Sequence, residues 1–359
     1  MAQIAQNRPA RLCILILCGA LGGISGSVPA LALTKAEARA AYSAAEALRD
    51  TDALAAFDAM ARLSDAGDGR ATSRLAYYTL RGIGTPEDPA RAAALYEKAV
   101  QQGHTRSKLS RAKVLMMQGQ GEIAAPLFEE AVADQIQGAP AEAAAAHALS
   151  RLGALSRPEA GWRDLQALAQ AGDPSAELTL LRVAARRQQV ALADAAALLA
   201  RVHARAEEGE GRAAEALLPY LRGPGRASTG SLAVRQAMTT HPGVRPQVSV
   251  TEQLYLAAEL QPHRFWRAAE EIVHGAAPAA RERGVVVTAK INRNAYLWVV
   301  EPHLQALGYD LRGRRGYLNR SHIRALNAVC RSAGASVDCR QGPLKSVSIK
   351  RVAERLFGS

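Results

Sequence analysis

The stretch from Thr72 to Gly103 most constrains what this chain can fold into. It has the pattern of two short helices joined by a tight turn at Gly82 and Gly84, with the second helix beginning near Pro89. Small and apolar residues recur on one face of each helix, at Leu75, Ala76, Leu80, Ala93, Leu95, Tyr96 and Ala99. One such hairpin cannot bury its own apolar face, so it needs neighbouring copies of itself. The sequence therefore predicts an array of helical hairpins.

Glycines recur along the chain at the period of a two-helix repeat. With Gly103 as the end of one unit, comparable glycines lie at successive separations of 36, 35, 34 and 37 residues. The series is Gly67, Gly103, Gly138, Gly172 and Gly209. Tetratricopeptide-type units have periods of about 34 residues. The array is therefore predicted to begin near Lys35, to end near Leu221, and to form a domain over 33–222.

The best-formed hairpin resembles a known repeat. Its residues Leu75, Tyr78, Gly82, Gly84, Asp88, Ala92, Leu95, Tyr96, Lys98, Ala99 and Gly103 stand in the order typical of the Sel1-like repeat, a relative of the tetratricopeptide repeat. The resemblance implies an all-α fold, an α-solenoid whose concave face holds other proteins. It does not imply an active site.

The other repeats are degenerate but keep helical periodicity. Helices are predicted over 121–133, 161–171 and 191–206. Their inward-facing residues are expected to be Leu127, Phe128, Ala131, Trp162, Leu165, Leu168, Leu192, Leu198, Leu199 and Val202. We interpret these large side chains as core, and we expect polar side chains on the concave face to contact a partner.

The pattern breaks after the array. Glycine and proline pairs punctuate 223–248, which is predicted to be a loop or linker. Helical periodicity returns from Thr251 to Gly275, so 249–278 is interpreted either as a cap for the solenoid or as a bridge to a second domain over 279–359.

The N-terminus has the pattern of a secretory signal peptide over 1–32. Arg8 and Arg11 precede an apolar run from Leu12 to Ile24, and an A-x-A site follows, with cleavage expected after Ala32. An uncleaved anchor is the alternative. A lipoprotein signal is excluded, because Leu17 stands before the cysteine where such signals need a small residue. We therefore expect a periplasmic protein with no integral membrane span after cleavage.

Two cysteines remain after the signal, Cys330 and Cys339. In an oxidising compartment this pair is a candidate disulfide. Closing so short a loop would contribute about 2–3 kcal/mol on the chain-entropy model. Two unpaired thiols are the alternative, and a zinc site is disfavoured because two cysteines without a neighbouring histidine leave the coordination incomplete.

The C-terminal segment is strongly basic. Residues 279–359 carry 15 Lys plus Arg and 5 Asp plus Glu, giving +10 of the chain's +12. This imbalance points to an anionic partner for one domain.

The same segment resembles the three-helix peptidoglycan-binding domain of bacterial envelope proteins. The resemblance is carried by Leu304, Leu307, Gly308, Tyr309, Gly313, Gly316, Leu318, Ala325 and Leu326, and it covers about 60 residues, through Leu356. Physically, Gly308 is expected to end a helix, Gly313 and Gly316 to form the turn, and Asn319 or Ser321 to begin the next helix.

Three positions depart from that family's pattern. Glu301 and Cys330 stand where Gln is usual, and His322 stands where Thr is usual. Arginines also crowd the turn. Candidate glycan-binding residues are Arg312, Arg314, Arg315, Arg320 and Arg324, which can hold glycan carboxylates or a polyuronate by charge-assisted hydrogen bonds. A solvated basic face is the alternative.

No catalytic, metal-binding or cofactor-binding pattern is found. The eight histidines have no metal-ligand spacing, and phosphate-loop, dinucleotide and nucleophile-elbow motifs are absent. An approach of His303 and His322 across the C-terminal turn is one interpretation, and satisfied structural roles for the two rings are the favoured one. Nucleic-acid binding is disfavoured by export and by the lack of interleaved aromatic residues.

These observations favour a non-enzymatic periplasmic scaffold. Its arrangement resembles the Sel1-like components of alginate secretion, which implies a part in assembling an acidic exopolysaccharide export complex, with an envelope protein on the solenoid and an anionic polysaccharide on the basic domain. The alternative is a peptidoglycan-associated adaptor that tethers a wall enzyme or envelope complex. A β-lactam-hydrolysing enzyme ranks last, because the array lacks the cysteines of Sel1-like proteins of that kind.

Overall fold

The chain is all-α in the part that the structure describes. The structure is a computed structural model and describes residues 34–358 apart from 50, 152, 187–191, 193, 224–228 and 334–337. The predicted signal peptide lies outside these residues. The α-helices are α1 Lys35–Ala47, α2 Ala53–Asp65, α3 Gly69–Arg81, α4 Pro89–Gln101, α5 Ser107–Met117, α6 Gly121–Ala133, α7 Ala139–Leu149, α8 Pro158–Gln170, α9 Pro174–Arg186, α10 Ala195–Glu207, α11 Gly211–Leu221, α12 Thr229–Thr239, α13 Pro246–Leu260, α14 Phe265–Gly275, α15 Pro278–Ile291, α16 Arg293–Ala306, α17 Arg320–Ser332 and α18 Ser346–Phe357. Two 3-10 helices, η1 Pro262–Arg264 and η2 Asp338–Gln341, complete them.

The hairpin α3–α4 shows why these residues fold as they do. Asp68 caps α3 by accepting from two backbone amides, and Asp88 caps α4 by accepting from the Arg91 amide, ahead of a proline at the first position of α4. Gly82 ends α3 in the left-handed conformation. Gly84 has φ 66°, and a side chain there would overlap the carbonyl group of Ala53 at the start of α2. The predicted hairpin is confirmed, and its first helix begins three residues before Thr72.

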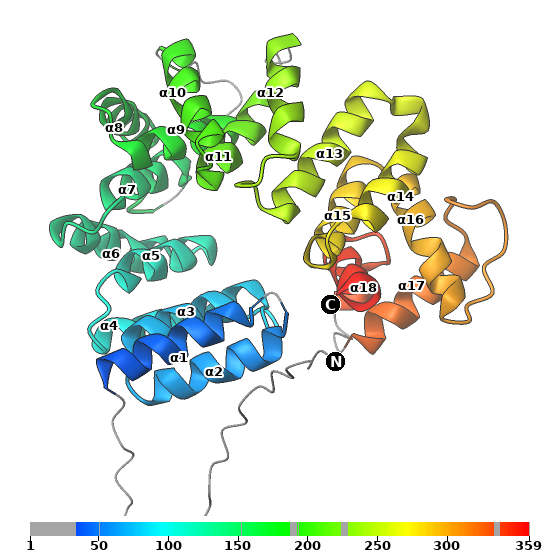
Figure 1. Ribbon diagram of the computed structural model, residues 1–359, viewed down its shortest axis with the longest axis horizontal. Helices are drawn as coiled ribbons and strands as arrows, with labels where there is room; N and C mark the ends of the chain where they lie inside the picture. The colour runs from blue at the N-terminus through cyan, green and yellow to red at the C-terminus, as the bar shows by residue number, and fades with distance from the viewer. Residues whose placement is uncertain are drawn as a thin grey trace, which may run out of the picture.

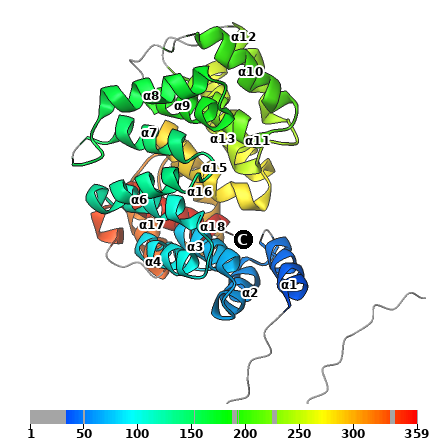
Figure 2. The same cartoon turned by 90° about the vertical axis from the view of Figure 1, so that its left-hand side faces the viewer.

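Successive hairpins pack side by side into a curved array. Figure 1 shows the chain following a broad arc from α1 to α13, and Figure 2 shows the hairpins stacked one above another. The all-α repeat fold expected from the sequence is confirmed. Most of the predicted inward residues are buried, among them Phe128, Trp162, Leu165, Leu198 and Val202, and the rest are partly buried against the same clusters.

Helix boundaries differ slightly from those expected. Helix α8 begins at Pro158, before the predicted residue 161, because proline is well suited to a first helical turn. Helix α10 begins at Ala195, after the predicted residue 191, which itself lies outside the described residues.

One phase marker of the repeat is corrected. Gly67, Gly103, Gly172 and Gly209 all follow a second helix with φ between 83° and 95°. In the third unit this place belongs to Gln135, with φ 54°. Each of these five turns has the same hydrogen bond, in which the next amide donates to the carbonyl five residues back. Gly138 lies three residues further on, as the N-cap of α7. The repeat register is therefore 36, 32, 37 and 37 residues.

The predicted linker over 223–248 contains a helix. Helix α12 occupies Thr229–Thr239, and α13 already begins at Pro246. The sequence pattern did not predict α12, because a charged residue occupies one of the buried positions of this helix. Arg235 is 1% exposed, and its Nε and Nη1 donate to Glu252 at 2.6 Å and Glu259 at 2.7 Å, both on α13.

Helix α13 joins the solenoid to the C-terminal domain. Val248 packs against the last core of the array, whereas Val250 and Leu254 belong to the C-terminal core. Helix α14 contributes Phe265 and Val273 to that same C-terminal core. Of the two interpretations of 249–278, the bridge fits the packing of α13 against both cores. The domain boundary expected at residue 279 is wrong, because α13 and α14 complete the core of the basic domain.

The arc brings distant parts of the chain together. Lys350 on α18 forms an ion pair with Glu87 in the turn between α3 and α4, and Figure 1 places α18 beside that end of the hairpin. Among the described residues, no helix is both long and apolar enough to cross a membrane.

Candidate functional site

The C-terminal domain is built as expected around a glycine-rich turn. Gly308 follows α16 with φ 85°, and Gly313 and Gly316 have φ 96° and 79° in the connection to α17. Asn319 is the residue that begins α17, because its Oδ1 accepts from the backbone amides of Ser321 and His322. Gly316 is required by packing as well, since a Cβ there would come 2.8 Å from the Trp266 ring.

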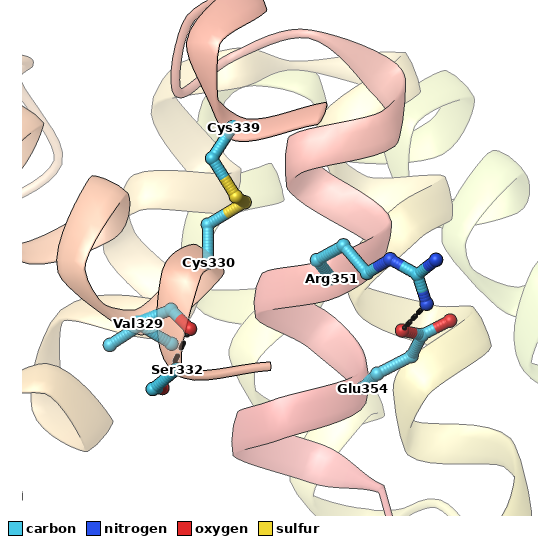
Figure 3. Close-up of a disulfide and its surroundings, with 6 residues drawn as sticks. All are labelled: Val329, Cys330, Ser332, Cys339, Arg351 and Glu354. Atoms are coloured by element: carbon cyan, nitrogen blue, oxygen red, sulfur yellow. Dashed lines mark hydrogen bonds and ion pairs between the residues drawn. A yellow bond between two sulfur atoms is a disulfide. The ribbon is translucent and has the colours of Figure 1, made fainter. Parts of the chain in front are cut away.

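A disulfide fixes the end of α17. Cys330 and Cys339 are bonded, their Cα atoms lie 5.9 Å apart, and both side chains are buried. Figure 3 shows the bond between the last turns of α17 and η2, facing α18. The predicted pairing is confirmed, and it ties η2 to the end of α17.

A groove of about 760 Å³ runs beside α17. One wall is the chain that follows α16, and the other is the exposed side of α17. Three arginines line it, Arg312, Arg324 and Arg331. The remaining lining residues are Tyr309, Asp310, Ser321, Ala325, Asn327 and Ala328. The groove is therefore a cationic surface with one aromatic ring and one carboxylate.

The backbone of Arg312 is held by hydrogen bonds, whereas its side chain is exposed. Its amide donates to Ser321 Oγ at 3.1 Å, and its carbonyl accepts from the Asn319 side chain. Its guanidinium is 84% exposed and pairs with Asp310 at 3.0 Å, itself 74% exposed. An ion pair so exposed is worth little, so an anionic ligand can replace Asp310 at low cost.

Arg324 and Arg331 lie on one face of α17. They are seven residues apart, about 10 Å along the helix axis, and both are exposed. Within the described residues neither has an ion-pair partner. Two guanidinium groups at this spacing can hold two carboxylates of one extended polymer, each with bidentate hydrogen bonds.

The other three predicted arginines lie outside the groove. Arg315 is an internal anchor, because its Nη2 pairs with Glu270 at 2.5 Å and donates to the Trp298 carbonyl at 3.0 Å. Its guanidinium also lies 3.9 Å from the Trp298 ring centre. Arg314 lies over Tyr317, and Arg320 is exposed at the first position of α17. Arg315 is therefore directed toward Glu270 and Trp298 through its Nη2 and does not line the groove.

Arg331 was missed by sequence reasoning. The signal was present, because Arg324, Asn327 and Arg331 stand at i, i+3 and i+7, which is one helix face. The candidates were chosen for their closeness to the turn, which ends shortly before α17. The groove depends instead on which face of α17 each arginine occupies.

His322 and His303 have other partners than expected. The interpretation that they approach each other across the turn is wrong. His322 lies against Glu301, with Nε2 and Oε2 3.3 Å apart, and both side chains are buried. His303 lies against His274 of α14, with 3.0 Å between their Nε2 atoms.

No family model matches this chain, and no curated protein matches it. Both resemblances therefore rest on the residues that carry them. Among the described residues, no group of three or more His, Cys, Asp or Glu side chains is arranged to hold a metal ion. The chemistry that the geometry supplies is that of anion recognition along the groove.

Proposed function

We propose that this protein is a non-enzymatic periplasmic scaffold that helps assemble the machinery for an acidic, alginate-like exopolysaccharide. The observation that carries the proposal is the groove with Arg312, Arg324 and Arg331. Repeating carboxylates along a polyuronate complement guanidinium groups spaced along a helix. The helical array supplies a long surface for an envelope protein, as repeat arrays generally do.

Two features support a periplasmic location. The N-terminal pattern of a signal peptide and the Cys330–Cys339 bond both fit an oxidising periplasm. The basic character of the chain then serves an anionic polymer rather than a nucleic acid.

The test is binding of soluble polyuronate to the mature chain, residues 33–359, with its disulfide intact. The whole chain is used because the C-terminal core begins in α13. We expect binding that weakens steeply as salt is raised. The double variant Arg324→Ala/Arg331→Ala is expected to bind at least tenfold more weakly, because each charge-assisted hydrogen bond contributes about 1.5–3 kcal/mol.

Arg320→Ala is the matched control. Arg320 is an exposed arginine on the same helix, outside the groove, so its removal changes net charge without changing the site. Binding that falls equally in Arg320→Ala and in an Arg324→Ala single variant would show that only overall charge matters, and would contradict the groove as the site.

A second candidate is a peptidoglycan-associated adaptor. It is supported by the sequence resemblance around Gly308, Gly313 and Gly316, all with positive φ, and Asn319, which caps α17. Sedimentation with insoluble peptidoglycan separates the two candidates. Pelleting that persists in high salt, without binding of soluble polyuronate, would replace the exopolysaccharide proposal with the adaptor.

A further inference from the structure

Two histidine rings meet on the side of the C-terminal domain formed by α14, α16 and α18. His274 lies in the last turn of α14 and His303 in the last turn of α16. Their Nε2 atoms are 3.0 Å apart, and the rings are stacked with centroids 5.3 Å apart and planes inclined by 25°. Phe357 of α18 lies 4.2 Å from the His303 ring. His274 is exposed and His303 is half-buried.

The separation of the two nitrogens matches that of two imidazoles bound to one metal ion. A metal–nitrogen distance of about 2.0–2.1 Å places two ligands about 2.9 Å apart at a right angle and about 3.3 Å apart at a tetrahedral angle. The observed 3.0 Å lies between these two values. In the structure this contact is a hydrogen bond between the two rings, so a metal ion is bound when the shared proton leaves Nε2 and the rings turn to aim both lone pairs at the ion.

We propose that His274 and His303 form a binding site for a divalent transition-metal ion, with Cu²⁺ preferred. Two imidazoles suit copper, nickel and zinc, and at such a site the affinity follows the order in which Cu²⁺ exceeds Ni²⁺ and Zn²⁺. Water fills the remaining coordination positions on the exposed side of His274. The inference is independent of the proposed glycan binding, since neither histidine lines the groove.

Sequence spacing gave no sign of the site, because the two rings are 29 residues apart and come from different helices. A bound metal would join the ends of α14 and α16.

The test is titration of the untagged mature chain with Cu²⁺ and, in parallel, with Zn²⁺. Isothermal titration gives affinity and stoichiometry, and the copper electron paramagnetic resonance spectrum reports nitrogen ligands. We expect one site per chain, two imidazole nitrogens on copper, and weaker binding of Zn²⁺. His274→Gln is expected to weaken copper binding at least tenfold, and His303→Gln to do the same.

His263→Gln is the control, because His263 is an exposed histidine on η1 that does not contact this pair. Its binding should equal that of the parent chain. His274 is exposed, so His274→Gln is expected to keep the fold, which circular dichroism checks. Copper binding that is unchanged in His274→Gln, or that does not saturate at one equivalent in the parent chain, would overturn the proposal.

Discussion

Glu301 and His322 face each other in the core of the C-terminal domain, with Oε2 and Nε2 3.3 Å apart and side chains 6% and 1% exposed. The distance between Nε2 and Oε2 is short enough for an ion pair when the ring is protonated, although the ring nitrogens are not aligned for a hydrogen bond. The carboxylate also accepts from the Gly316 amide at 3.0 Å, which ties the turn before α17 to α16. These are two of the positions at which the chain departs from the resembled domain, and the departures are partners of each other.

The first prediction concerns this pair. His322→Ala removes a buried ring that contacts Glu301 and leaves a cavity, so it is expected to cost about 3 kcal/mol of the free energy of unfolding. The double variant Glu301→Gln/His322→Thr, which restores the residues usual in the resembled domain, should cost less than the sum of its single changes. Denaturant unfolding of the parent chain, Glu301→Gln, His322→Thr and the double variant measures this coupling. Strictly additive changes would contradict a coupled pair.

The second prediction concerns Gln135. It has φ 54° at the helix end where the other units have glycine, and a left-handed backbone costs a residue with a side chain about 1 kcal/mol. Gln135→Gly should therefore stabilise the protein by about 0.5–1 kcal/mol. The reciprocal change Gly103→Gln should destabilise the protein, because Gly103 has φ 88°. A Cβ there would meet no other atom within 4 Å, so backbone strain is the only cost. A loss of stability in Gln135→Gly would show that its side chain matters more than its backbone.

The third prediction is a pH dependence. Burial tends to raise the pKa of Glu142, but Lys113 and Arg182 outweigh it and the net pKa is lowered. An acid whose pKa is lower in the folded state stabilises the protein above its unfolded pKa, and that stabilisation is lost as the pH falls through its folded value. Stability should therefore decrease below about pH 4.5.

Glu142→Gln tests this assignment. The carboxylate joins α5, α7 and α9, because it contacts Lys113 at 2.8 Å and Arg182 at 2.9 Å. We expect the variant to lose about 1 kcal/mol at neutral pH and to differ less from the parent chain at pH 3 than at pH 7. Thermal unfolding across the pH range measures both, and an equal difference at both pH values would contradict the assignment.

The fourth prediction concerns the disulfide. Reduction should lower the free energy of unfolding by about 2–3 kcal/mol, since the bond closes a short loop. It should also loosen the end of α17 that carries Arg331 and so weaken the binding of an anionic polymer. Unfolding with and without a reductant measures the first effect. The variant Cys330→Ala/Cys339→Ala should not respond to the reductant, and a response there would assign the effect to another cause.

Much of the fold followed from local sequence. The hairpin α3–α4 was predictable because its capping aspartates, its turn glycines and its apolar face all lie within one short stretch. Phe128 and Leu165 were predictable as core for the same reason, since helical periodicity alone assigns them to an inward face. Helix α12 was missed because one of the few side chains that it buries, Arg235, is charged. Gly138 was misplaced because glycine is only the usual residue at a helix end, and Gln135 takes the left-handed conformation instead.

The candidate site was only partly predictable. Arg312 and Arg324 were identified from their positive charge. Charge alone does not distinguish an exposed arginine from Arg315, which already pairs with Glu270 and donates to the Trp298 carbonyl. That distinction depends on the packing of α14 against α16, and the sequence pattern left α14 open as part of a cap for the solenoid or of a bridge.

The sequence by itself determined the helical class, most of the helices and the approximate repeat, because backbone hydrogen bonds, caps and periodic apolar faces involve residues that are close in the chain. Only the tertiary structure decided which charged and titratable groups meet. Glu301 with His322, His274 with His303, and Arg312 with Arg324 and Arg331 come from different elements, and their separations depend on how those helices pack. Packing against a shared core is a long-range property, so no local pattern in the sequence records it.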